Sequence, residues 1–202
     1  MNTPAAPGAT AEHRVKGSRF IARVLPAADR QTVDRLLAEV REQYPDATHI
    51  CQAYRLWGAD VKPVEYSTDA GEPRGSAGVP MLNTLRRHEL VDCLAWVVRY
   101  YGGTNLGIPG LIAAYGRAVE NAMDSVSTTP WVALVARRLL IPYPLVDRVK
   151  AAIIKAGGKI LDEEYGIYVV LLTMLPTTSE KALLEQVQEW GGGTVRIDPQ
   201  GD

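Results

Sequence analysis

An apolar run, a glycine-rich segment and an amphipathic stretch follow one another between residues 90 and 126, and their order most constrains the fold. Residues 90–98 have the length and composition of a buried strand. Glycines and a proline interrupt residues 102–110, and apolar residues recur at helical spacing after them. A strand, a glycine loop and a helix start direct backbone N–H groups and the positive end of the helix dipole into the loop. We therefore expect a phosphate or carboxylate site here, unless the glycines only let the strand and the helix pack closely.

Composition limits the class of protein. The 202 residues suffice for one large domain or two small ones, and a formal net charge of −1 gives no overall attraction to nucleic acid. Any RNA contact must therefore depend on a local basic patch. Cys51 and Cys93 stand in apolar runs, no signal-peptide pattern precedes them, and no apolar run is long enough to cross a bilayer. We expect a cytoplasmic protein with reduced, buried thiols and no membrane contact.

The first residues predict a tail and a strand region. Residues 1–12, which are rich in proline and alanine, are expected to form a disordered tail. Residues 13–25 alternate apolar and basic side chains, as one or two strands near a surface do. Gly17-Ser18 is interpreted as a bulge between them.

A helix and a second strand region follow. Asp29 is suited to cap a helix that ends before Pro45. Residues 49–57 are expected to form a strand. The chain then turns at residues 58–60 and continues in an edge strand, because Pro63 cannot donate a ladder hydrogen bond.

Residues 67–80 form another glycine loop, which is the first of the two along the chain; the loop at residues 102–110 is the second. Its glycines and prolines exclude a regular element, and Ser76 is expected to cap a short helix that follows. Asp69 and Glu72 could act together in acid–base chemistry or hold Mg²⁺. In the simpler interpretation Asp69 caps the turn and Glu72 is exposed. We favour the simpler one, because no histidine stands nearby in the sequence.

The C-terminal part has internal symmetry after a proline-containing linker at residues 127–130. Strand and helix patterns alternate as βαββαβ, which is the ferredoxin-like plan. The spacing of Thr177 and Glu180 predicts a capping box for the last helix. We expect one domain over residues 13–129 and a second over residues 130–202. Basic residues that could contact nucleic acid in the second are Arg137, Arg138, Lys159 and Arg196.

Common catalytic and metal motifs are missing from the sequence. The second glycine loop has neither the Gly-Lys-Ser/Thr end of a P-loop nor the dinucleotide fingerprint spacing, and no nucleophile elbow occurs in the sequence. His49 and Cys51 fall on one strand face and could meet Cys93, but the spacing matches no zinc pattern. We expect no metal and no cofactor. Of Tyr100 and Tyr101, at most one is free to stack on a base or ring, because neighbouring strand residues point to opposite faces.

Two long motifs resemble the signature of the IMPACT family. They are STDAGEPRGSAGVPML at residues 67–82 and VVRYYGGTNLG at residues 97–107. Residues 16–22 and 47–55 are similar to the family too, so the resemblance covers most of the chain. It implies an α+β protein of two domains. The first would have the fold of domain 2 of a small-subunit ribosomal protein, also seen in domain IV of elongation factor G, and the second would be ferredoxin-like, as in domain V of that factor.

The resemblance also implies a translation-related or nucleic-acid-binding role, since eukaryotic members regulate translation by competing for the ribosome-associated activator of a stress kinase. The chain departs from the family pattern at five positions, one of which is Pro109, where glycine is frequent and a proline fits the first turn of a helix. Ala70 replaces one of two adjacent acids, Asn105 stands where lysine is common, and Ala113 stands where arginine is common. Arg74 occupies a position that is usually small. The departures at positions 105 and 113 remove positive charge beside the second loop.

We therefore expect a non-enzymatic protein that binds RNA, the ribosome or a translation-associated protein. One alternative is an enzyme or ligand-binding protein for a small phosphate-bearing molecule, with Asp69 or Glu72 as base or metal ligand. Another is a protein-interaction adaptor in translational control. The expectation requires that both glycine loops meet at one accessible hollow. The candidate ligand-binding residues are Asp69, Gly71, Glu72, Arg74, Gly75, Ser76, Arg99, Tyr101, Gly102, Gly103, Thr104, Asn105 and Gly107.

Overall fold

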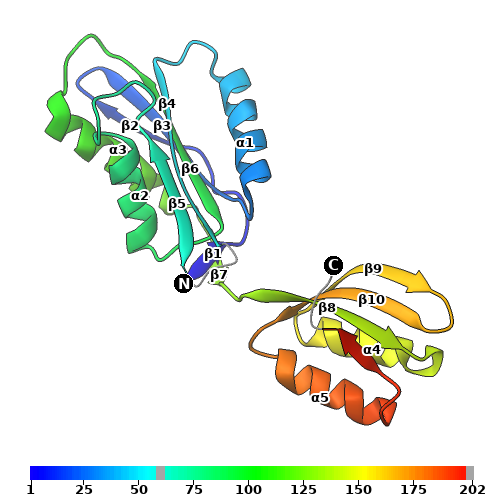
Figure 1. Ribbon diagram of the computed structural model, residues 1–202. Coiled ribbons are helices and arrows are strands. Elements are labelled where there is room, and N and C mark those ends of the chain that lie inside the picture. Colours follow the sequence, from blue (N-terminus) through cyan, green and yellow to red (C-terminus); the bar gives the residue numbers. More distant parts are fainter. Residues whose placement is uncertain (58–61, 199–202) are drawn as a thin grey trace. The chain divides into compact units, whose positions relative to one another are not determined.

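The computed structural model of the protein describes residues 1–57 and 62–198 (Figure 1). The chain folds into two compact units, Met1–Trp131 and Val132–Asp202. Each unit has a hydrophobic core of its own. The division falls just beyond residue 129, where the sequence suggested a boundary.

The first unit is an antiparallel five-stranded sheet with helices on both faces (Figure 1). Its strands are β2 (Ala11–Val15), β3 (Ser18–Pro26), β4 (His49–Trp57), β5 (Pro63–Thr68) and β6 (Cys93–Tyr100), and its helices are α1 (Arg30–Gln43), α2 (Gly78–Arg87) and α3 (Gly107–Met123). The strand order is β2-β3-β6-β4-β5. Helices α2 and α3 pack against one face and α1 against the other.

The central strand β6 explains why its sequence is continuously apolar. Cys93, Ala95 and Val97 pack into the core under α2 and α3. Leu94, Trp96 and Val98 pack into the core under α1. A strand that is buried on both faces has no polar side, so it lacks the usual alternation. The predicted strand is confirmed, although it begins at Cys93 rather than at residue 90.

Two segments that were expected to lack regular structure form strands instead. β1 (Asn2–Pro4) pairs with β7 (Thr128–Pro130), so part of the expected tail and the expected linker hydrogen bond to each other. The amide of Asn2 also donates to the carbonyl of Glu89 at 2.9 Å. Main-chain hydrogen bonds hold this ribbon of two short strands together. No side-chain periodicity in these residues predicts the strands.

Some of the other predictions for the first unit are confirmed, and one is wrong. Asp29 caps α1, because its Oδ1 accepts from the Thr32 amide at 2.7 Å. Gly17-Ser18 is not a bulge: Lys16 and Gly17 both have positive φ and form a two-residue hairpin turn between β2 and β3. β5 is an edge strand, as Pro63 predicted. The turn expected at residues 58–60 lies outside the described residues.

The second unit confirms the ferredoxin-like plan. Its elements are β8 (Leu134–Ile141), a short 3₁₀ turn at Tyr143–Leu145, α4 (Val146–Lys155), β9 (Lys159–Tyr165), β10 (Val169–Pro176), α5 (Glu180–Gly191) and β11 (Arg196–Asp198). The antiparallel strand order is β11-β8-β10-β9, with α4 and α5 packed on one face. The predicted capping box is wrong. Helix α5 begins at Glu180 after Ser179, and the amide of Thr177 donates to the carbonyl of Ala133.

Candidate functional site

The site of the first unit is built around Arg99, near the end of β6. In the strand register Arg99 lies opposite Phe20 of β3 and His49 of β4. It follows Val97 by two residues, so its side chain points to the face covered by α2 and α3. The guanidinium lies 5.4 Å from the ring centroids of both Phe20 and Tyr101. Only 6% of the side chain is exposed.

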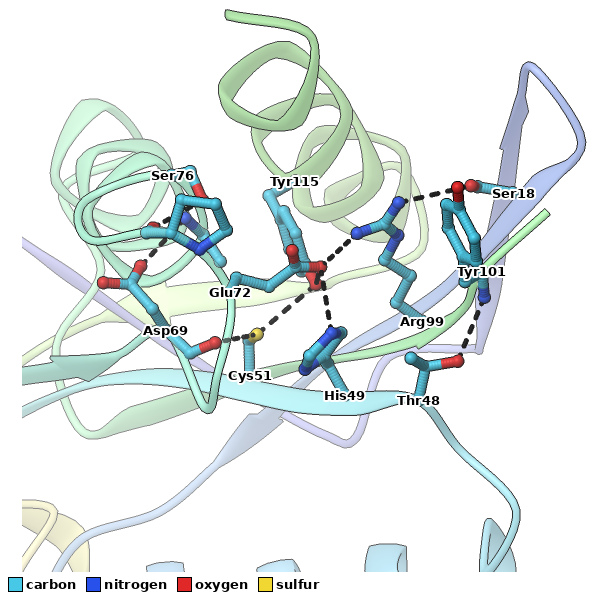
Figure 2. A network of polar contacts seen from close by, with 12 residues as sticks. Ser18, Thr48, His49, Cys51, Asp69, Glu72, Ser76, Arg99, Tyr101 and Tyr115 are labelled. Carbon is cyan, nitrogen blue, oxygen red and sulfur yellow. Dashed lines mark hydrogen bonds and ion pairs between the residues drawn. The ribbon is translucent and has the colours of Figure 1, made fainter. Parts of the chain in front are cut away.

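Glu72, from the first glycine loop, pairs with this buried cation (Figure 2). Arg99 Nη1 donates to Glu72 Oε1 at 2.6 Å, and the Tyr115 hydroxyl donates to the same oxygen at 2.7 Å. The Glu72 side chain is 3% exposed, so the interpretation of Glu72 as an exposed residue is wrong. An ion pair so far from water is retained only when further hydrogen bonds satisfy it, and Tyr115 of α3 supplies one.

Tyr115 and Cys51 continue this network into the core. Burial is the main cause that raises the pKa of the Tyr115 phenol, so the hydroxyl stays a donor to Glu72. Burial raises the pKa of the Cys51 thiol to about 12. The thiol donates to the carbonyl oxygen of Asp69 at 3.0 Å. A thiol with such a pKa is no nucleophile at neutral pH.

Asp69 caps α2 from the first glycine loop. Its carboxylate accepts hydrogen bonds from the amides of Gly75, Ala77 and Gly78 at 2.8 to 2.9 Å. Burial alone would raise the pKa of Asp69, but these three N–H groups outweigh it and hold the pKa below its usual range. The prediction that Ser76 caps this helix is wrong, because its hydroxyl donates to the carbonyl of Pro73.

The N-terminus of α3, after the second glycine loop, has no such cap. Leu106 stands at the cap position, and no side chain within the described residues hydrogen bonds to the first turn. A hollow of about 490 Å³ opens beside it. Both loops contribute to its wall, as the sequence required. The lining residues are Thr48, His49, Glu72, Pro73, Arg99, Tyr101, Asn105, Leu106, Gly107, Ile108 and Leu111.

His49 lies on this wall and contacts the backbone of the first glycine loop. Its Nδ1 lies 2.9 Å from the carbonyl oxygen of Ala70. A carbonyl only accepts, so Nδ1 is the donor in this contact. Nε2 lies 4.0 Å from Glu72 Oε1. The sequence placed His49 on the same strand face as Cys51 but considered it only as a metal ligand.

The hollow includes five of the residues proposed from the sequence and leaves out eight. Glu72, Arg99, Tyr101, Asn105 and Gly107 line it. The structure places Asp69, Gly71, Arg74, Gly75, Ser76, Gly102, Gly103 and Thr104 outside its lining.

Two of these eight residues, Gly71 and Gly102, allow close packing. A Cβ at residue 71 would lie 3.3 Å from His49 Nδ1, so Gly71 lets the loop approach that ring. A Cβ at residue 102 would lie 1.9 Å from the carbonyl carbon of Gly17, so Gly102 is a packing glycine. Ala113 lines a different hollow between α2 and α3. An arginine at position 113 would therefore not line the hollow beside Arg99, so the alanine found there does not change the charge of that hollow.

The four basic residues of the second unit do not form one patch. Arg137 lies on the helix face of the sheet and pairs with Glu180 at 2.5 Å. The register places Arg138, Lys159 and Arg196 on the other face. Asp162, Glu164 and Asp198 share that face, and Arg138 lies 3.8 Å from Glu164. These acids offset the three basic charges, so the face has no net positive charge from these side chains.

The described part of the chain contains neither a metal cluster nor a membrane-spanning helix. No group of three or more histidine, cysteine or acidic side chains within residues 1–57 and 62–198 is arranged to hold a metal ion. None of the helices in these ranges is long and apolar enough to cross a membrane.

The fold and the site define a two-unit α+β protein, in which a helix-covered antiparallel sheet with a buried Arg–Glu pair precedes a ferredoxin-like unit. Residues 16–123 match the model of the Impact N-terminal domain, and residues 139–194 match a domain of unknown function, DUF1949. The chain belongs to the IMPACT family.

Relatives support this membership along nearly the whole chain. The chain is 31% identical over 194 residues to IMPACT family member YigZ of Escherichia coli (strain K12), covering 96% of this chain and 95% of that protein. It is 38% identical over 117 residues to IMPACT family member YvyE of Bacillus subtilis (strain 168), covering 57% and 53%. A solved structure described as "Crystal structure of an hypothetical protein" superposes with a TM-score of 0.76 at 30% identity, covering 100% of this chain and 97% of the other.

Proposed function

We propose that this protein is a non-enzymatic, translation-associated binding protein that contacts RNA or the ribosome through the hollow of its first unit. One observation carries the proposal: the hollow is lined by the uncapped N-terminus of α3 and by a buried guanidinium. A helix N-terminus without a side-chain cap offers free N–H groups and positive potential to a phosphate. Membership of the IMPACT family fits a translation-associated role.

The groups that could catalyse a reaction are bound to other groups of the chain. Asp69 holds the start of α2, and one oxygen of Glu72 is occupied by Arg99 and Tyr115. The thiol of Cys51 is protonated at neutral pH. This arrangement favours recognition over covalent or acid–base chemistry.

The first unit is a better candidate for phosphate contact than the second. On the open face of the second sheet, acids alternate with Arg138, Lys159 and Arg196. Phosphate binding requires an excess of positive charge, and this face offers none from those side chains. Such a mixed face suits a protein partner better, which is the adaptor role.

Co-sedimentation with ribosomes and with ribosomal RNA across a salt series tests the proposal. Asn105→Asp places a carboxylate beside the N-terminus of α3, where it competes with a phosphate. We expect association of the natural protein at low salt, decreasing as salt rises, and about a fivefold weakening in Asn105→Asp, equivalent to about 1 kcal/mol. Asn83→Asp is the matched control, because Asn83 is exposed on α2 and does not line the hollow.

Three results would count against the proposal. Lack of salt-dependent association at low ionic strength removes RNA and ribosome binding. Equal weakening by both asparagine substitutions places the contact outside the hollow. Association that resists nuclease and salt favours the adaptor role.

A small anionic molecule is the second candidate occupant, because the hollow is concave and its volume of about 490 Å³ lies within the range of small-molecule sites. A thermal-shift screen of nucleotides and phosphorylated metabolites tests this candidate. A stabilising compound whose effect is lost in Asn105→Asp but kept in Asn83→Asp would support it.

A further inference from the structure

The most exposed large apolar side chains of the described residues lie on two neighbouring parts of the second unit, helix α4 and the hairpin of β9 and β10. Four residues exceed all others in exposed fraction: Ile167 at 92%, Ile154 and Tyr165 at 61%, and Leu161 at 56%. Ile154 belongs to α4, Leu161 and Tyr165 to β9, and Ile167 to the turn that follows β9. Large apolar groups that gather on neighbouring elements and stay exposed mark a contact surface for another molecule.

Hydrogen bonds hold the hairpin beside the first half of α4. The hydroxyl of Tyr143, three residues before the helix, donates to the carbonyl of Gly166 at 2.9 Å. On the helix itself Lys150 donates to the Tyr165 hydroxyl at 3.2 Å. Ile154 stands one turn after Lys150 on the same flank of the helix. Exposed apolar groups therefore lie at both ends of α4, the tyrosines at its start and Ile154 near its end.

The outer side of α4 also carries an ordered set of charges. Asp147 in the first turn, Ala151 in the middle and Lys155 in the last turn follow one another at intervals of four residues, and all three are exposed. Asp147 and Lys155 are eight residues apart, or about 12 Å along the helix, so they cannot pair with each other. Neither makes an ion pair with any described residue. The two charges are free for a partner that presents the opposite signs in the opposite order.

A second copy of α4 in antiparallel orientation presents this order. With a two-fold axis at Ala151, Asp147 of each copy faces Lys155 of the other. The small alanine side chain at the axis lets the two helices approach closely. The same operation brings Ile154 of each copy to the start of the other helix, where the exposed tyrosines lie. A parallel pair of helices would instead place aspartate against aspartate and lysine against lysine.

We propose that the outer side of α4 joins two copies of this chain in an antiparallel, two-fold symmetric contact. The occupant is a second copy because the charges at the two ends of the helix complement each other, and the apolar groups at its two ends meet in the same arrangement. This inference does not rest on the proposed function, since it concerns a surface of the second unit and the proposed function concerns the hollow of the first.

Sedimentation velocity of the full chain, over a concentration series that reaches about 1 mM, tests the inference. We expect the weight-average mass to rise with concentration from that of one chain toward that of two and to stop there. The mass of one chain at every concentration overturns the inference. A mass that continues to grow beyond two chains also overturns it, because a two-fold contact closes on itself.

An apolar substitution then locates the contact. Ile154→Lys places a charge among the apolar groups, and we expect it to weaken self-association about tenfold. Ile112→Lys is the matched control, because Ile112 is also exposed on a helix but belongs to α3 of the first unit. Circular dichroism checks that both variants fold. Should Ile154→Lys not fold, Ile167→Lys at the exposed turn replaces it and must weaken association too. Equal self-association of the folded variant and the control overturns the assignment.

A charge exchange tests the antiparallel pairing itself. Asp147→Lys and Lys155→Asp each place like charges opposite one another, and we expect each alone to weaken self-association about fivefold. The double variant restores opposite charges, so its association should return to within about twofold of the natural protein. If the two charges served only the helix dipole, the double variant would be the least stable of the three and would not regain association. A double variant that associates no better than the single ones overturns the antiparallel arrangement.

Discussion

The two glycine loops of the first unit look alike in sequence but differ in how the helix that follows each of them is capped. Each is rich in glycine, and each leads into a helix, α2 in one case and α3 in the other. At α2 the carboxylate of Asp69 accepts hydrogen bonds from three amides of the loop and the helix start. At α3 none of the described side chains caps the first turn. The first loop supplies its own anion, and the second supplies none.

The comparison shows that glycine content is a poor guide to whether a helix start is capped. What decides is whether the chain carries an acid that can reach the helix start. Asp69 reaches amides six to nine residues ahead of it because the loop between folds back. In the second loop Asn105, which stands two residues before the start of α3, accepts from the Tyr101 hydroxyl instead.

Removing the built-in anion has the largest expected effect. In Asp69→Ala, three amide donors lose their acceptor, and two of them, on Ala77 and Gly78, belong to buried residues. We expect the free energy of unfolding to fall by about 3 kcal/mol, measured by urea denaturation at pH 7. Asp46→Ala, at an exposed aspartate, should change it by less than about 0.5 kcal/mol. If the two variants were equally stable, Asp69 would not organise its loop.

The second loop depends on backbone packing, which Gly102→Ala would test. The added Cβ would clash with the backbone of Gly17 and Ser18, so the hairpin turn must move away. We expect a loss of about 2 kcal/mol in unfolding free energy. Gly103→Ala is the matched control: its φ is +81° with open space around it, and about 1 kcal/mol of backbone strain is expected. A smaller loss for Gly102→Ala than for Gly103→Ala would contradict the packing role.

The smallest of the three effects is expected at acidic pH, where the carboxylate of Asp69 should stabilise the fold less. The folded pKa of Asp69 lies below its unfolded value, so the carboxylate stabilises the fold above about pH 4. This stabilisation is lost as the pH falls through the folded pKa. The stability difference between the natural protein and Asp69→Ala should therefore be constant from pH 7 to about pH 5 and shrink toward pH 3. Urea titrations at each pH measure it, and a difference that stays the same at pH 3 would show that the charge of Asp69 is irrelevant.

Local patterns predicted the elements of this fold better than its site. The unbroken apolar run of β6 and the βαββαβ order of the second unit could be recognised because burial imposes a side-chain period. The cap at Asp29 could be recognised because its partner, Thr32, is three residues away. In contrast, the bond between β1 and β7 depends on main-chain groups far apart in the sequence.

The site depends on long-range register, and this is why Glu72 was misjudged. Its partners Arg99 and Tyr115 follow it by 27 and 43 residues, and only the folded sheet brings them together. His49 becomes a wall of the hollow because it lies opposite Arg99 in the pairing of β4 with β6. The sequence carries no signal for that pairing beyond the apolar character of both strands.

The ribbon of β1 and β7 has a practical consequence for handling this protein. Trp131, whose indole nitrogen donates to Asp92 at 2.7 Å, also donates its amide to the carbonyl of Met1. The first residues and the last residues of the first unit are thus fastened to each other. Removal of residues 1–4 would take away the strand that pairs with β7 and so loosen the last residues of the first unit.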